Sequence, residues 1–146
     1  MLLNQLSEAA KAYDNIYSEA VAYHELGYIA HEQRCFDAAE GWYKKSLDIS
    51  LKLGNDLDAA GSYHQLGMIS QERRDFDAAE DWYKKSLSLS QKMDNSIVVK
   101  AYHQLGMIAK ERQDFDVAED WYKKSLALKC TQEDEQGTAL TYLILV

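Results

Sequence analysis

Three stretches of this 146-residue chain bring together carboxylates, aromatic rings and lysines, the residue types that build acid–base sites. They read CFDAAEGWYKKSL at 35–47, DFDAAEDWYKKSL at 75–87 and DFDVAEDWYKKSL at 114–126. In the second stretch Glu80 precedes Lys84 by four residues, and the next acid and lysine, Asp81 and Lys85, have the same spacing. Such pairs can serve general acid–base chemistry, but on a helix they also form ordinary ion pairs.

These stretches belong to a longer repeat. Tyr-His pairs stand at 23–24, 63–64 and 102–103, so equivalent points are 40 and then 39 residues apart (63 − 23 and 102 − 63). Residues 63–87 and 102–126 are identical at 21 of 25 positions. Repetition over this length is typical of a structural unit. We therefore interpret the charged residues as a solvated helix face, whose ion pairs recur as Glu40 with Lys44, Glu119 with Lys123 and Asp120 with Lys124.

The spacing within each unit predicts two helices. Apolar and small residues recur three and four positions apart, in Tyr63, Leu66, Gly67 and Ser70 and again in Phe76, Ala79, Tyr83 and Leu87. Asp75 is predicted to cap the second helix with its carboxylate, and Asp114 has the equivalent position. Cys35 lacks such a side chain, so we expect that helix start to be weaker by about 1 kcal/mol.

We expect one all-α domain over 1–146. Its predicted helices are about 16–33, 36–53, 56–73, 76–93, 96–112 and 115–130, each joined to the next by a short turn. They form full repeats at 16–55, 56–95 and 96–131. Residues 1–15 are predicted to supply only the second helix of a preceding repeat, at 2–13, and 132–146 only the first helix of a following one. One hairpin cannot bury its own apolar face, so the repeats must stack.

Composition narrows the functional classes. A net charge of −8 and a pI near 4.9 disfavour nucleic acid as a partner. No apolar run approaches the roughly 18–20 residues that span a bilayer, and the start lacks the basic region of a signal peptide. Cys35 and Cys130 fit no metal or redox spacing. We therefore expect a cytoplasmic protein with no membrane association.

No constellation of catalytic residues is evident. His24, His64 and His103 occupy one equivalent position per repeat, roughly 10 Å apart if the helices pack normally, which is too far to share a metal ion. The glycines are isolated, so there is no phosphate-binding loop. The sequence predicts no enzyme, no cofactor and no metal site, and a pH response of the three histidines is a further hypothesis.

The chain resembles the tetratricopeptide repeat family. That family has an aromatic residue followed by Leu-Gly, and later an aromatic residue, an alanine and another aromatic residue. The matching residues here are Tyr23, Leu26, Gly27, Phe36, Ala39 and Tyr43; Tyr63, Leu66, Gly67, Phe76, Ala79 and Tyr83; and Tyr102, Leu105, Gly106, Phe115, Ala118 and Tyr122. The resemblance implies a right-handed α-solenoid of stacked antiparallel hairpins. The period of 39–40 resembles the variety found in kinesin light chains and bacterial signalling ATPases.

In this family the first helix of each repeat lines a concave groove that binds peptides or partner helices. The resemblance implies groove positions at Val21, His24, Glu25, Tyr28, His31 and Glu32; Gly61, His64, Gln65, Met68, Gln71 and Glu72; and Lys100, His103, Gln104, Met107, Lys110 and Glu111. These side chains should point away from the core stripe at 23, 26, 27 and 30, and they mix aromatic, Met and polar groups as adaptable binding surfaces do. We expect a non-catalytic protein-binding module.

Three further hypotheses concern the partner. Some family members grip a C-terminal carboxylate with a Lys/Asn/Asn/Lys/Arg set; of the matching positions only Lys100 fits, so this clamp is not expected here. The apolar C-terminal end could stack head to tail on another copy as a homo-oligomer, through Leu140, Tyr142, Leu143 and Leu145. Alternatively, the chain could be the sensor part of a larger signalling ATPase.

Overall fold

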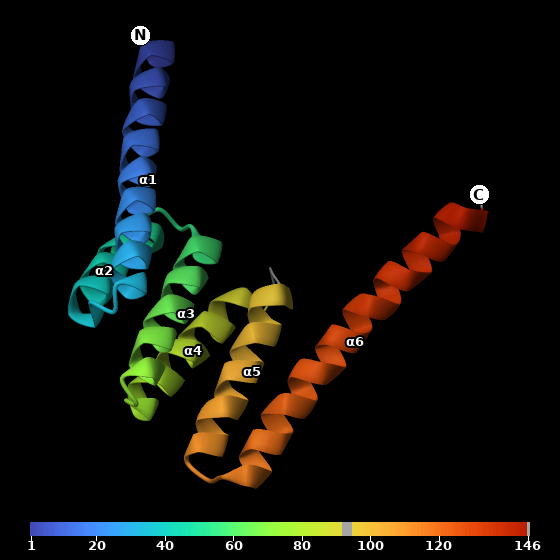
Figure 1. Ribbon diagram of the computed structural model, residues 1–146. Coiled ribbons are helices and arrows are strands. Elements are labelled where there is room, and N and C mark those ends of the chain that lie inside the picture. The colour runs from blue at the N-terminus through green and yellow to red at the C-terminus, as the bar shows by residue number, and fades with distance from the viewer. Residues whose placement is uncertain (92–94, 146) are drawn as a thin grey trace.

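The part of the chain that the structure describes contains six α-helices and no strands (Figure 1). This computed structural model describes the backbone of residues 1–91 and 95–145 and the side chains of residues 1–91 and 96–131. The helices are α1 (Leu2–Glu32), α2 (Phe36–Lys52), α3 (Asp56–Glu72), α4 (Phe76–Ser90), α5 (Asn95–Glu111) and α6 (Phe115–Leu145). They form three successive hairpins, α1–α2, α3–α4 and α5–α6, that stack side by side. The all-α solenoid of hairpins is confirmed.

In each hairpin a glycine of the first helix contacts a tyrosine ring of the second helix. A Cβ atom added to Gly67 would lie 2.7 Å from Cε1 of Tyr83, and Gly27 and Gly106 face their own tyrosine rings at 2.8 Å. Tyr83 is fully buried. The absence of a side chain on the first helix therefore lets the second helix approach closely and bury its aromatic ring.

The core is continuous from one hairpin to the next. Tyr43 and Leu47 of α2 pack in one cluster with Leu66 and Ile69 of α3. A second cluster joins α4 to α5 with the equivalent residues Tyr83, Leu87, Leu105 and Ile108. Hydrophobic burial between hairpins thus repeats with the sequence, as expected for units that cannot fold singly.

Serine hydroxyl groups join the two helices of each hairpin. Ser86 donates a hydrogen bond to the carbonyl of Ala60 at 2.8 Å, and Ser46 and Ser125 make the equivalent bonds to residues 26 positions earlier. Ser86 is fully buried, so its polar group is satisfied inside the core. These bonds fix the position along the first helix at which the second helix crosses it.

The turn within each hairpin uses a left-handed residue that is not glycine. Arg34, Arg74 and Gln113 have φ values of 59°, 61° and 63°. In the second hairpin the next amide, that of Asp75, donates to the carbonyl of Ser70 at 2.8 Å, which is the bond that ends a helix in a Schellman motif. Between hairpins α2 is followed by Gly54, which has a φ of 70° and so supplies the left-handed residue after that helix.

Most of the predicted surface contacts of the second helices are present. The Oδ1 atom of Asp75 accepts a hydrogen bond from the amide of Ala78 at 3.2 Å, and Cys35 makes no such cap. Ion pairs join Glu40 to Lys44, Glu80 to Lys84 and Glu119 to Lys123 at 2.7, 2.6 and 2.9 Å.

The second predicted ion pair of α4 and that of α6 are wrong. Among the described side chains no ion pair joins Asp81 to Lys85 or Asp120 to Lys124. Lys85 lies instead over the Trp82 ring, 4.9 Å from its centroid, and Lys124 lies in the same way over Trp121 at 4.7 Å. A cation over an indole ring gains as much as an exposed ion pair, so the neighbouring aromatic residue captures the lysine.

The predicted helix ends near 14–15 and 131–132 are also wrong. The two helices predicted at 2–13 and 16–33 are one helix, α1 (Leu2–Glu32). Likewise α6 does not end near residue 130 but continues to Leu145. Counting by the repeat period, Asp14 and Glu133 stand where Gly54 ends α2. Neither residue adopts the left-handed backbone as readily as glycine, so both helices continue. The assignment of 1–15 and 132–146 to partial repeats stays a prediction.

Leu26 was predicted as a core residue, and its side chain is 41% exposed. The equivalent residues Leu66 and Leu105 are 1% and 2% exposed, because the preceding hairpin covers them. No described residue covers the corresponding face of α1. The predicted C-terminal contact residues Leu140, Tyr142, Leu143 and Leu145 lie outside the described side chains.

Replacing Gly67 by alanine should destabilise the protein, because the new methyl group would overlap the buried Tyr83 ring. We expect a loss of about 1–3 kcal/mol in the free energy of unfolding, measured by urea denaturation. Gly61 lies on the same helix with nothing within 4 Å of its would-be Cβ, so Gly61→Ala is the matched control. The control should gain about 0.5–1 kcal/mol from helix propensity. Equal effects of the two changes would contradict the proposed role of Gly67.

Candidate functional site

Three of the four histidines of the predicted groove lie beside the tyrosine rings that hold the hairpins together. The His24 and Tyr43 ring centroids are 5.2 Å apart, and the pairs His64–Tyr83 and His103–Tyr122 are separated by 5.2 and 5.4 Å. Because each tyrosine is fixed against a glycine, each histidine is held at a set position on the first helix. Each of these three histidines therefore packs against a tyrosine ring and is also partly exposed at the surface.

His64 is the most enclosed of the three. Burial, together with the nearby Lys100 ammonium group, lowers the pKa of His64 to about 4. Its Nδ1 atom is buried and has no hydrogen-bond partner among the described residues. His64 is consequently neutral throughout the physiological pH range and does not fit the hypothesis of a histidine that responds to pH within that range.

The tyrosine hydroxyl groups differ between repeats because the residue beside them differs. Tyr83 donates a hydrogen bond to Oε1 of Gln71 at 2.8 Å. At the equivalent position of the first repeat stands His31, whose Nε2 atom lies 3.0 Å from Oε2 of Glu72 in the next repeat. The Tyr43 hydroxyl is left buried without a partner among the described residues, and burial raises the pKa of Tyr43 to about 12.

The remaining predicted groove residues fall into two groups. Met68 packs against the second core cluster, and Gln65 and Gln104 are half-buried. Tyr28 and Met107 are 52% and 36% exposed. The other exposed members are Val21, Glu25, Glu32, Glu72, Lys100, His103, Lys110 and Glu111. The predicted groove residues are thus divided between packing positions and the molecular surface.

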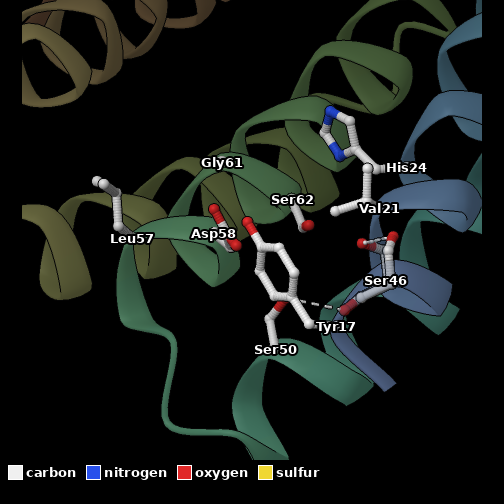
Figure 2. A pocket seen from close by; sticks show the side chains of 10 residues that line it. Tyr17, Val21, His24, Ser46, Ser50, Leu57, Asp58, Gly61 and Ser62 are labelled. Carbon is white, nitrogen blue, oxygen red and sulfur yellow. Dashed lines mark hydrogen bonds between the residues drawn. The ribbon is translucent and has the colours of Figure 1, made fainter. Parts of the chain in front are cut away.

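A pocket of about 280 Å³ opens between the first and second hairpins. It is lined by Tyr17, Ala20, Val21 and His24 of α1, Ser46 and Ser50 of α2, and Leu57, Asp58, Gly61 and Ser62 of α3. Figure 2 shows the Tyr17 ring reaching across the pocket toward Asp58, with His24 and Val21 above it. The Asp58 carboxylate accepts a hydrogen bond from the Asn55 amide at 2.7 Å and meets no cation among the described residues.

Gly61 keeps this pocket open. A Cβ built on Gly61 would meet nothing within 4 Å. The equivalent position in the third repeat is Lys100, whose charge acts on His64 in the corresponding space between α3 and α5. The equivalent of Asp58 is Ile97. The space between the first and second hairpins thus contains the Asp58 carboxylate and an open pocket. The space between the second and third hairpins has the Lys100 ammonium group beside it instead.

Sequence reasoning found only part of this pocket. It named Val21, His24 and Gly61, but missed Tyr17, Leu57 and Asp58. Tyr17 was missed because helix α1 was expected to begin beside it, and it now projects from a continuous helix. The exchange of Gly61 for Lys100 between otherwise similar repeats was the signal that could have located the site.

Metal binding, cysteine chemistry and membrane insertion find little support in the described residues. They contain no group of three or more His, Cys, Asp or Glu side chains that could hold a metal ion. Cys35 and Cys130 are free and exposed. Among the same residues no helix is long and apolar enough to cross a membrane.

Comparison with known families identifies the class of protein. A tetratricopeptide repeat model matches residues 18–92 and again residues 58–131. The chain therefore belongs to the tetratricopeptide repeat family, and it is in general terms a protein–protein interaction module. A search of the curated proteins gave no match.

Solved structures share the fold at low sequence identity. BtubC (BKLC) from P. vanneervenii matches with a TM-score of 0.74 and 22% identity, over 89% of this chain and 59% of that one. The TPR domain of Arabidopsis FLU has a TM-score of 0.71 and 18% identity, over 80% of this chain and 98% of that one. The N-terminal domain of stress-induced protein-1 (STI-1) from C. elegans has a TM-score of 0.68 and 20% identity, over 77% and 86%. This chain spans less than two thirds of the length of BtubC.

The buried His64 should make stability depend on pH. The unfolded chain binds a proton at His64 near pH 6.5, but the folded chain does so only near pH 4. Its contribution is therefore complete above about pH 6.5 and is lost as the pH falls toward 4, by up to about 3 kcal/mol.

Urea unfolding at pH 7 and pH 4.5 tests this dependence. His64→Gln should lose distinctly less stability than the unmodified protein between these two values, because its side chain does not titrate. His103→Gln changes the exposed equivalent and should behave like the unmodified protein. Parallel losses in all three proteins would show that His64 is not responsible.

Proposed function

We propose that the protein binds a peptide or partner helix, without catalysis, along the groove formed by α1, α3 and α5. The main support for this proposal is the pocket between the first two hairpins, because its lining includes the predicted groove residues His24 and Gly61. Family membership supports a protein partner in general. Tetratricopeptide repeat proteins are generally non-catalytic scaffolds, which agrees with this proposal.

The pocket suits a basic side chain of the partner. The aliphatic stem of an arginine or lysine would lie against Val21 and Leu57, and its charged head would reach the Asp58 carboxylate. The Tyr17 ring beside Asp58 would add a cation–π contact. The pocket thus offers both the apolar wall and the opposite charge that such a side chain requires.

Charge along the groove supports a defined orientation of the partner. Glu25, Glu32 and Asp58 are exposed acids at the first two repeats. Lys100 and Lys110 follow at the third, where the remaining acid, Glu111, lies 3.5 Å from Arg74. A segment with basic residues at one end and acidic residues at the other would match this sequence of charges.

Peptides selected from a phage-displayed random library, measured by calorimetry, test this function. We expect selected peptides to share an arginine or lysine. Their affinity should fall at least tenfold on Gly61→Lys, which fills the pocket with the residue type of the equivalent position. Asp58→Asn should cost roughly five- to tenfold, since it removes one partner of a charge-assisted contact.

Two control variants match these changes. Gly41 lies on α2, away from the pocket, and its would-be Cβ also meets nothing within 4 Å, so Gly41→Lys adds the same charge elsewhere. Asp48 is an exposed acid of α2 that pairs with Lys52 at 2.9 Å, so Asp48→Asn matches the loss of charge. Peptides that bind all four variants equally would rule out this pocket, and failure to select any peptide would count against groove binding itself.

The remaining hypotheses keep their status as predictions. A role as the sensor of a signalling ATPase would require further domains. Head-to-tail association through Leu140, Tyr142, Leu143 and Leu145 involves side chains that are not described.

A further inference from the structure

The two end faces of the hairpin stack expose apolar residues whose equivalents inside the stack are buried or half-buried. The front face comprises Glu19, Leu26, Ile29 and Glu32 of α1. The back face comprises Lys110 of α5 and Phe115, Tyr122, Leu126 and Lys129 of α6. In the stack of Figure 1 they belong to the first and the last hairpin.

The exposed apolar residues match the two internal interfaces. Leu26 and Ile29 are 41% and 51% exposed, whereas their equivalents in α3 and α5 are all 1–2% exposed. Leu126 is 62% exposed, whereas its equivalents Leu47 and Leu87 are 7% and 8% exposed. Inside the molecule these two sets pack against each other, α2 on α3 and α4 on α5.

The back face also forms an apolar depression of about 360 Å³, lined by Lys110, Phe115, Ala118, Glu119, Tyr122, Lys123 and Leu126. Phe115 is 63% exposed, whereas Phe36 and Phe76 are half-buried and pack against the core clusters. The depression is the surface that a following hairpin covers in the interior of the stack.

From this match we propose that a second copy of the chain covers the back face with its front face. The contact would be a third instance of the internal interface, with Leu26 and Ile29 of one copy on Tyr122 and Leu126 of the next. Because the two faces are different surfaces, the association is heterologous and can continue to a linear chain of molecules. This inference does not depend on what the groove binds.

Charges at the two ends favour a second copy over an unrelated partner. The small residues Ser50 and Ser90, both nearly buried, have Lys129 as their equivalent on the back face. The buried Ala59 and Val98 have Glu19 as their equivalent on the front face. Ser50 borders the first turns of α3, where Ala59 lies. In the stacked pair, Lys129 would therefore meet Glu19 at the corresponding place.

A second pair of opposite charges is placed in the same way. Between the first two hairpins His31 lies 3.0 Å from Glu72. Counted by the repeat, the back-face residue equivalent to His31 is Lys110, and the front-face residue equivalent to Glu72 is Glu32. Stacking would bring these two exposed groups together, again with opposite charges.

One internal contact has no counterpart at the ends, and this makes the association weak. Arg73 reaches back to Asp37 at 2.5 Å and Glu40 at 3.4 Å. Arg112 reaches back to Asp77 and Glu80. The back face has the matching acids Asp116 and Glu119, but the front-face position equivalent to Arg73 is Gln33. A copy-to-copy contact therefore lacks the arginine that closes each internal interface.

Analytical ultracentrifugation from about 10 μM to 1 mM, at low salt, tests the proposal. The average mass should rise above the monomer value of 16.7 kDa as the concentration increases. Gln33→Arg supplies the missing arginine and should shift association to at least tenfold lower concentration. A mass that is the same for Gln33→Arg and the unmodified protein at every concentration would overturn the proposal.

Charge exchange identifies the surfaces that associate. Lys129→Glu and Glu19→Lys should each weaken association about five- to tenfold, and the double variant should restore it. Leu126→Glu should leave the protein monomeric, with its helical content checked by circular dichroism. Unchanged association of a folded Leu126→Glu variant, or no rescue by the double variant, would show that other surfaces are responsible.

Discussion

The contact between a glycine of each first helix and a tyrosine of the following helix is the constraint on which the rest of the structure depends. It sets the distance between the helices of a hairpin, since a Cβ on Gly27, Gly67 or Gly106 would overlap the ring. The ring, once fixed, supports a groove histidine on one side and takes part in the contact with the next hairpin on the other. Groove and stack are therefore positioned by the same side chain.

The sequence predicts well those features that one repeat determines by itself. The hairpins, the Asp75 cap, the buried Ala79, Tyr83 and Leu87, and the first ion pair of each second helix all follow from local spacing. Where a local pattern has two possible outcomes, the sequence alone does not decide. Lys85 could pair with Asp81 or lie over Trp82, and the structure shows the second.

Features that depend on a neighbouring repeat were predicted less well. Leu26 has the pattern of a core residue, but burial requires a preceding hairpin, and among the described residues the chain provides none for α1. The breaks expected near 14–15 and 131–132 rested on the repeat period, but Asp14 and Glu133 stand there in place of Gly54, the left-handed residue that follows α2. The pocket at Gly61 was missed because it combines residues of three helices.

The positions at which the repeats differ are more informative than those at which they agree. A side chain that is identical in every repeat serves the packing that every repeat needs. Gly61 and Lys100 occupy one position at which the repeats differ, so one inter-repeat space is open and the next has a lysine beside it. Glu19 and Lys129 replace small or apolar residues only at the end faces, where no internal contact requires a charge. Lys129 nevertheless lines one pocket with Lys100 and His103, and Glu32 and Lys110 belong both to the proposed groove and to the end faces. Binding along the groove and stacking at the ends would therefore engage some of the same residues.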